Sequence, residues 1–185
     1  LVASFFQPHD ICQWLRINRD NPPELRYPAI RDKLPKLPEN FEPDPREPAL
    51  VKERRQRVEP AQGDWSPEHW RFYRWSYYRH IEMVDAEIGR VHDALMRSPY
   101  RDNTLFLFTA DHGDGLGFHG KVSKGFMEEE AWRVPAMVAF PGRLPQGSQD
   151  SQHLTSGVDI PATICDYADV PPLPKMTLGR SWRPL

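Results

Sequence analysis

Residues 104–124 (TLFLFTADHGDGLGFHGKVSK) limit the possible folds of this chain more than any other segment of its sequence. They begin with an apolar run of strand-forming residues, 105–108, and change abruptly at Asp111 to a glycine-rich loop. In an open α/β sheet, ligands bind where the strands end at their carboxyl edge. The segment therefore predicts a buried strand that delivers polar side chains to a binding site.

Asp111 and His112 stand directly after this strand, where the chain turns and both side chains can converge on one point. A carboxylate oxygen and a neutral imidazole nitrogen are both ligands for divalent cations. Two ligands do not complete a metal site, so the others must come from elsewhere. The alternative is that Asp111 caps a turn and His112 lies at the surface.

Further polar side chains on the same loop suit an anionic substrate. Lys124 offers an ammonium for sulfate or phosphate oxygens, and Lys121 competes for this role. The alternative is that either lysine is a solvated surface residue. His119 lies on the same loop, between the end of the strand and the two lysines. His9 follows a separate β-prone run, residues 1–7, and a histidine at a strand end can donate a proton to a leaving oxygen.

The sequence contains no evident nucleophile. Neither Cys12 nor Cys165 lies in a nucleophile elbow, and the two form no CxxC pair, so we expect free, buried thiols. No Walker A loop is present.

The charge and hydropathy patterns exclude two classes of partner. The net charge is −2, so no global basic field recruits nucleic acid. No apolar run approaches the ~20 residues needed to span a bilayer. The basic run 52–57 and the acidic run 128–130 are typical of solvated faces.

Three segments follow from composition. Residues 1–19 hold a β-prone run and a strand-end histidine, and residues 20–64 are dense in proline, which indicates an extended arm or a plain linker. Residues 65–185 alternate helical and strand patterns. Strands are expected at 104–110 and 134–140, and this order indicates an α/β fold with helices packed on a sheet.

A long helix, about 67–97, begins at Ser66-Pro67, where serine suits the cap and proline the first turn. Its apolar stripe predicts core packing rather than a cofactor site, although the tryptophans near its start could stack on a sugar ring. Residues 155–167 indicate a strand end that runs into a second helix. The stripe consists of Trp70, Tyr73, Tyr77, Ile81, Val84, Ile88, Val91 and Leu95.

Five segments, taken in order, resemble the C-terminal part of the sulfatases, within the alkaline phosphatase-like superfamily. They are SFFQPHD (4–10), MVDAEIGRVHDAL (83–95), the D-N-T to V-P region (102–142), SGVDIPATICDYADVP (156–171) and LGRSWRPL (178–185). The resemblance implies a partial alkaline phosphatase-like sheet flanked by helices, with the proline-rich segment as an extended arm.

The resemblance also implies roles for matched positions. Asp111 and His112 would be ligands of a divalent cation, calcium in typical sulfatases. Lys124 and His119 would face the substrate, with Lys124 on the sulfate, and His9 would lie near the leaving-group oxygen. Zinc or manganese would replace calcium in phosphoester hydrolases of the same superfamily.

Two family features are missing: the formylglycine motif, and the paired aspartates near the N-terminus that supply the other metal ligands. Sulfatases carry a formylglycine made in a C/S-x-P-S/A-R motif, which this chain lacks, so formylglycine is expected in an upstream segment of a longer chain. We therefore expect part of a sulfuric ester hydrolase that is inactive alone, acts on a sulfate ester, and self-associates through an exposed sheet edge. The sequence leaves the compartment unknown, and the resemblance implies the periplasm or the outside of the cell only for a chain typical of the family. The alternatives are a phosphoester hydrolase or a non-catalytic binding module.

Overall fold

The computed structural model divides into two compact units. It describes residues 1–21, 23–62, 64–172 and 178–183. Unit 1 consists of Leu1–Ser98 and His112–Val134, and unit 2 consists of Pro99–Asp111 and Pro135–Leu185. These units divide the chain at other positions than the boundaries expected after residues 19 and 64, which stay predictions.

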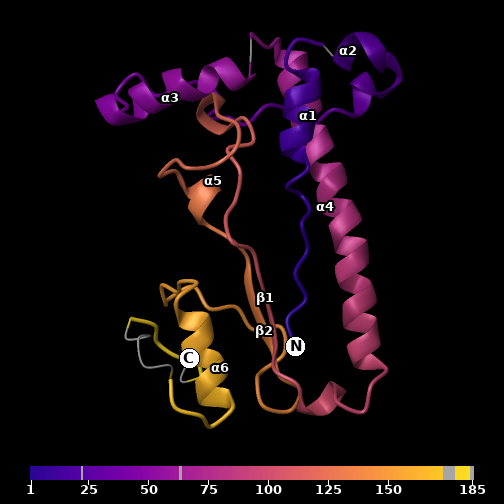
Figure 1. Ribbon diagram of the computed structural model, residues 1–185, viewed down its shortest axis with the longest axis vertical. Coiled ribbons are helices and arrows are strands. Elements are labelled where there is room, and N and C mark those ends of the chain that lie inside the picture. Colours follow the sequence, from indigo (N-terminus) through magenta and orange to yellow (C-terminus); the bar gives the residue numbers. More distant parts are fainter. Residues whose placement is uncertain (22, 63, 173–177, 184–185) are drawn as a thin grey trace. The chain divides into compact units, whose positions relative to one another are not determined.

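The long helix of unit 1, α4, spans Pro67–Met96 and confirms the expected helix of about 67–97 (Figure 1). Ser66 caps it, because its side-chain oxygen accepts a hydrogen bond from the amide of His69 at 3.1 Å. Pro67 occupies the first turn, where a missing N–H costs nothing, and Glu68 complements the positive end of the helix dipole.

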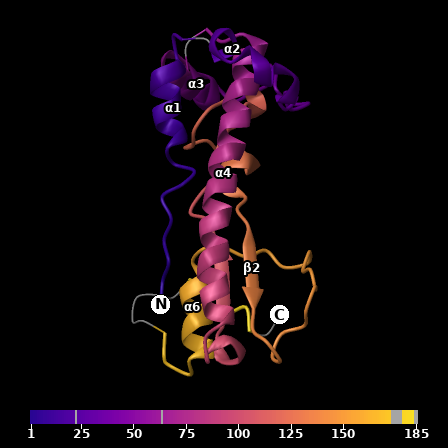
Figure 2. The same cartoon turned by 90° about the vertical axis from the view of Figure 1, so that its right-hand side faces the viewer.

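The core of unit 1 lies around the first half of α4. Helices α1 (Ile11–Asn18) and α2 (Pro23–Arg26) pack against it, and Figures 1 and 2 show α1 alongside its upper end. Tyr73 is fully buried there among aromatic neighbours, so core packing of the aromatic stripe is confirmed. Further along the stripe, Ile81 is exposed.

Trp65 and Trp70, near the start of α4, belong to this core, whereas Trp75 is half-buried. Trp65 stacks on His69 with a ring separation of 4.3 Å, and Trp70 meets Trp65 edge-on at 4.9 Å. Both tryptophans are buried, so neither is available to stack on a sugar ring.

The proline-rich segment is only partly extended. Besides α2 it contains the 3-10 helix η1 (Pro28–Lys33) and helix α3 (Ala49–Gln62), which leaves residues 34–48 without a helix or strand and with turns at 39–40 and 45–46. Prolines at 23 and 28 begin helices, where the fixed backbone angle of proline is favourable. Pro22 lies outside the described residues.

The strand expected at residues 1–7 is absent: residues 1–6 are irregular and a turn follows. A β-prone sequence becomes a strand only where another strand satisfies its backbone groups. The described strands, β1 and β2, both belong to unit 2.

Unit 2 contains a two-stranded antiparallel sheet. β1 (Phe106–Thr109) pairs with β2 (Ala136–Ala139), and Phe106 lies opposite Ala139. Both expected strands are confirmed, although each is shorter than predicted. The 3-10 helix η2 (Arg101–Asn103) precedes β1.

Helix α6 (Asp159–Tyr167) completes unit 2 and confirms the second expected helix, but the strand end expected before it is irregular. The ring of Tyr167 lies 5.8 Å from that of Phe140, which follows β2. The carboxylate of Asp159 accepts the amide of Arg180 at 2.8 Å and so holds the closing segment, of which residues 184–185 lie outside the described residues.

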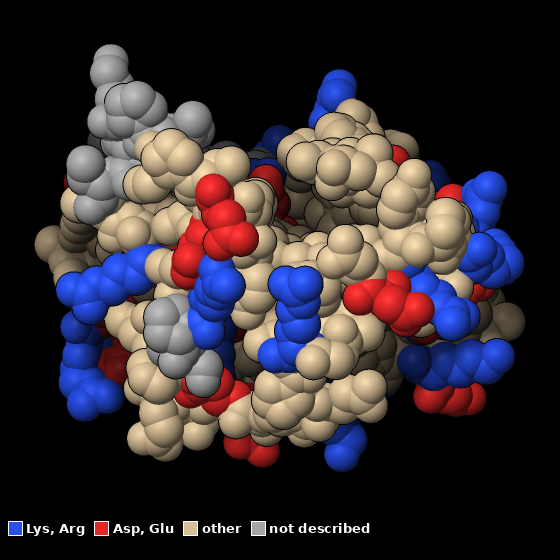
Figure 3. Space-filling model, turned by 90° about the horizontal axis from the view of Figure 1, so that it is seen from below, with Lys and Arg blue, Asp and Glu red and all other residues tan. Residues whose placement is uncertain are grey.

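Two further expectations concern the cysteines and membranes. Cys12 and Cys165 are free thiols, as expected, but both are only half-buried. Within the described residues, no helix combines the length and apolar character required to cross a bilayer. On the face shown in Figure 3, positively and negatively charged side chains lie close to one another.

Replacing Ser66 by alanine should lower the free energy of unfolding of unit 1 by about 1 kcal/mol, because the amide of His69 loses its acceptor. Urea unfolding followed by tryptophan fluorescence measures the change, since Trp65 and Trp70 lie in the core. The control is Ser66→Thr, which keeps an accepting oxygen. Equal losses in both variants would contradict the capping role.

Candidate functional site

The strand end carries the two candidate metal ligands, as the sequence predicts. β1 ends at Thr109, and the exposed Asp111 and the half-buried His112 follow it. Asp111 is the last residue of its segment of unit 2, whereas His112 begins the second segment of unit 1. Their joint role in a metal site stays a prediction.

The surroundings of His112 fix its tautomer. Its Nδ1 lies 2.8 Å from the carbonyl oxygen of Gly113. A carbonyl oxygen only accepts, so Nδ1 carries the proton and the lone pair is on Nε2. Gly113 is required here, because a side chain would collide with the backbone oxygen of Glu130.

The donor chemistry of Asp111 and His112 fits a divalent cation. One supplies hard carboxylate oxygens and the other an imidazole nitrogen of the form that binds metals. The described residues contain no cluster of three or more His, Cys, Asp or Glu side chains that could hold a metal. These two residues therefore fit as part of a ligand set that other groups must complete.

Asp114 holds both ends of the loop that follows. Its Oδ1 accepts the hydroxyl of Tyr73 at 2.7 Å, the amide of Leu116 at 2.9 Å and the amide of Ser123 at 3.2 Å. Burial raises the pKa of Asp114, while the bond from Tyr73 opposes the rise. We did not identify Asp114 from sequence, although a carboxylate between two glycines after a strand is a usable signal.

His119 occupies a strained position that neighbouring residues of unit 1 stabilise. Its φ of 53° lies in the left-handed region, which is unfavourable for residues other than glycine. Its amide donates to the carbonyl of Asn40 at 2.8 Å, its Nε2 lies 3.2 Å from the Asn40 side-chain nitrogen, and Arg55 donates to its carbonyl. The loop there forms the 3-10 helix η3 (Phe118–Gly120).

The two candidate lysines have opposite environments. Lys121 is buried, ion-paired with Glu128, and lies 4.9 Å from the ring centre of Phe126. Burial lowers the pKa of Lys121, while Glu47 opposes the change. Lys124 is half-buried. Lys124 is therefore the more accessible of the two lysines, and its contact with a substrate stays a prediction.

The charge runs are not simply solvated faces. Arg55, from the basic run 52–57, is buried, and Glu128, from the acidic run, pairs with Lys121. The acidic run continues into the short helix α5 (Glu129–Trp132).

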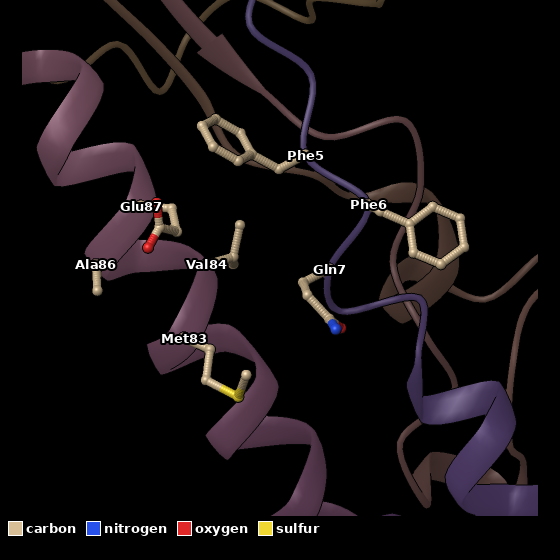
Figure 4. Close-up of a pocket in the computed structure, with 7 residues that line it drawn as sticks. All are labelled: Phe5, Phe6, Gln7, Met83, Val84, Ala86 and Glu87. Atoms are coloured by element: carbon tan, nitrogen blue, oxygen red, sulfur yellow. The ribbon is translucent and has the colours of Figure 1, made fainter.

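His9 is exposed in the turn that precedes α1, where its ring lies 4.6 Å from that of Phe6. An apolar pocket of about 420 Å³ lies beside this segment, lined by residues 5–7 and by Met83, Val84, Ala86 and Glu87 of α4. Figure 4 shows Phe5 directed toward α4 and Phe6 directed away from it. The apolar lining of this pocket does not suit an anion.

Comparison with known sequences gives a consistent result. A family model described as Sulfatase matches residues 4–170. A delta 4,5-hexuronate-2-O-sulfatase of Bacteroides thetaiotaomicron is 30% identical over an alignment 183 residues long, which covers 91% of this chain and 36% of that protein. A choline-sulfatase of Rhizobium meliloti is 38% identical over 109 residues, 58% of this chain and 20% of that protein.

Solved structures confirm the predicted α/β fold. A putative sulfatase from Bacteroides thetaiotaomicron is 28% identical with a TM-score of 0.81, over 96% of this chain and 39% of that one. A 2-O GAG sulfatase gives 28% identity, a TM-score of 0.82 and the same coverage. A phosphonate monoester hydrolase from Silicibacter pomeroyi is 27% identical with a TM-score of 0.69, over 83% of this chain and 32% of that one. The chain spans 36% to 39% of the length of the sulfatases that it matches over most of its own length.

The Tyr73→Phe variant removes the hydroxyl that donates to the half-buried Asp114, so we expect the free energy of unfolding at neutral pH to fall by about 1–3 kcal/mol. Urea unfolding followed by tryptophan fluorescence gives the value. Tyr27→Phe, at an exposed position, is the matched control and should stay within about 0.5 kcal/mol of the wild type.

The same variant tests a pH dependence. Burial raises the pKa of Tyr73 well above its usual value and that of Tyr77 to about 12. An unfolded tyrosine ionises near pH 10, whereas the native residues keep their protons, so stability should be complete below about pH 10 and fall above it. In Tyr73→Phe the fall should be shallower by about 1.4 kcal/mol per pH unit. Equal slopes would argue against a buried, protonated Tyr73.

Proposed function

The chain belongs to the sulfatase family, and we propose that it forms part of a sulfuric ester hydrolase, contributing residues that bind a metal and the sulfate. The observation that supports this most is the loop after β1. Asp111 and His112 stand at its start, and the half-buried Lys124 lies just beyond the segment whose two ends Asp114 holds.

The role proposed for Lys124 is electrostatic. An ammonium held at a fixed position stabilises negative charge on the sulfate oxygens without reorganising as the charge develops. The hydrogen bond from the amide of Ser123 to Asp114 supports such a fixed position, because it anchors the residue before Lys124. His119 lies on the same loop and would contact the substrate beside Lys124.

The role proposed for His9 is proton donation. When the S–O bond breaks, the alcohol oxygen takes up negative charge, and an imidazolium can donate a proton to it. The exposed position of His9 allows such access.

Asp111 and His112 would hold the metal, for which we propose calcium. Bound there, the metal would polarise the sulfate oxygens as a Lewis acid. No residue of this chain fits the formylglycine, since Cys12 and Cys165 lie outside any C/S-x-P-S/A-R motif. We therefore propose that the nucleophile comes from sequence outside these 185 residues, as the share of the relatives' length that the chain spans suggests.

The test is hydrolysis of an aryl sulfate by a longer protein that contains this chain. We expect Lys124→Ala to lower kcat by roughly 100-fold to 1000-fold and His9→Ala by roughly 100-fold or more. Asp111→Ala should have a similar effect that added calcium offsets in part. Lys36→Ala, at an exposed position, is the control, and the 185-residue chain alone should show no turnover.

Unchanged turnover in Lys124→Ala, His9→Ala and Asp111→Ala would reject the assigned roles. Turnover by the isolated chain would reject the need for further sequence.

A second candidate function is phosphoester hydrolysis. The similarity to a phosphonate monoester hydrolase, with a TM-score of 0.69, favours it over a non-catalytic binding module. Rates measured with paired aryl sulfate and aryl phosphate substrates separate the two activities, and metal analysis separates calcium from zinc or manganese. A longer protein that turns over neither substrate would favour the binding module.

We also propose that the sheet mediates self-association. Each strand of the two-stranded sheet has one neighbour among the described residues, and in β2 the side chains of Met137 and Val138 are exposed. Unpaired strand edges with apolar side chains pair with other chains. Sedimentation of the 185-residue chain should show species larger than a monomer, and Val138→Lys should shift them toward the monomer. A monodisperse wild-type monomer would contradict this.

A further inference from the structure

A buried cluster of four charges joins α3 and the residues before it to the loop that carries Lys124. Glu47 and Arg55 come from the proline-rich segment, and Lys121 and Glu128 come from the loop region, all within unit 1. Arg55 lies 2.5 Å from Glu47, and the ammonium of Lys121 lies 3.6 Å from the same carboxylate and is ion-paired with Glu128. The two positive and two negative charges balance.

The degree of burial makes the balance important. The exposed fractions of these side chains are 2% for Lys121, 9% for Glu47, 10% for Arg55 and 21% for Glu128. Removing one member of a buried ion pair leaves the other charge uncompensated and is strongly destabilising. The buried ion pairs of Lys121 therefore restrict the position of the backbone at this residue.

The backbone around Lys121 is strained on both sides. His119 and Ser123 have φ values of 53° and 66°, in the left-handed region. Such conformations persist only where the surroundings fix them. Next to them, the carbonyl of Lys121 accepts the amide of Gly117 at 2.8 Å, and the amide of Gly115 donates to Ser123 at 2.6 Å.

We infer that Lys121 is a positioning residue that, through its buried contacts with Glu47 and Glu128, fixes the loop conformation that presents Lys124. This rests on the proposed function only for the role of Lys124. The side chain of Lys121 is too deeply buried to touch a substrate. Its effect is to hold the backbone three residues before Lys124, between two strained positions.

The first test uses Lys121→Met in the 185-residue chain, which keeps the length of the side chain and removes its charge. Amide hydrogen exchange at Gly117 and His119 reports the conformation of the loop. The amide of Gly117 donates to the carbonyl of Lys121, and the amide of His119 donates to the carbonyl of Asn40. We expect exchange at these amides to become at least ~100-fold faster. Lys36→Met, an exposed lysine, is the matched control and should leave exchange unchanged.

The second test separates charge from packing. In the double variant Lys121→Met/Glu128→Gln no carboxylate is left without its partner, because Arg55 still pairs with Glu47. We expect exchange to return to within ~10-fold of the wild type, since neutral replacement of a buried pair is well tolerated. If Lys121→Met does not fold, Glu128→Gln is the milder variant and should show the same effect at Gly117 and His119.

The third readout reports the position of Lys124 itself. After reductive ¹³C-methylation, the NMR signal of Lys124 should shift in Lys121→Met and return in the double variant. Ser66→Ala, which lowers the stability of the same unit elsewhere, should leave the signal in place.

Three results would overturn the inference. They are loop exchange no faster than in Lys36→Met, an unmoved Lys124 signal, and a double variant as perturbed as the single one. None of these readouts depends on turnover, so a failure of the proposed sulfatase function leaves them intact, and their failure leaves the proposed function intact.

Discussion

The hydrogen bond from the hydroxyl of Tyr73 to Asp114 is the interaction on which the candidate site depends. Tyr73 is fully buried in the core on the first half of α4, so its hydroxyl has a fixed position. The acceptor is a carboxylate that also receives the amides of Leu116 and Ser123. One oxygen therefore connects the helical core to both ends of a loop that has little regular structure of its own.

The proline-rich segment supplies the other support for this loop. Asn40 bonds to His119, and Arg55 and Glu47 reach the neighbourhood of Lys121. A segment that composition assigns to an extended arm or a plain linker thus carries side chains that hold the loop of the candidate site. Loops of irregular backbone keep one conformation when such neighbours satisfy their polar groups.

The elements that local signals determine were predictable from sequence. Ser66 and Pro67 mark the start of α4, and the apolar runs around β1 and β2 indicate strands. Residues 1–7 could not be settled in this way, because a strand is a property of a pair and not of one segment.

The lysine environments show the same limit within the site. Lys121 and Lys124 are the same residue type on one loop, and only the structure shows that the first is buried. Its partner Glu47 is distant in sequence, and the folded chain brings the two together. The role of Asp114 also depends on a partner that is distant in sequence. That partner is Tyr73, which the helical periodicity assigned only to the core.

The pairing of β1 with β2 has a consequence for how the family can vary. Thr109 lies opposite Ala136, so the intervening polypeptide leaves the sheet and returns to the same place. The entropy of closing such an excursion grows only with the logarithm of its length, and doubling the length costs roughly 0.6 kcal/mol. An insertion of irregular polypeptide there would therefore cost the pairing of the two strands little free energy.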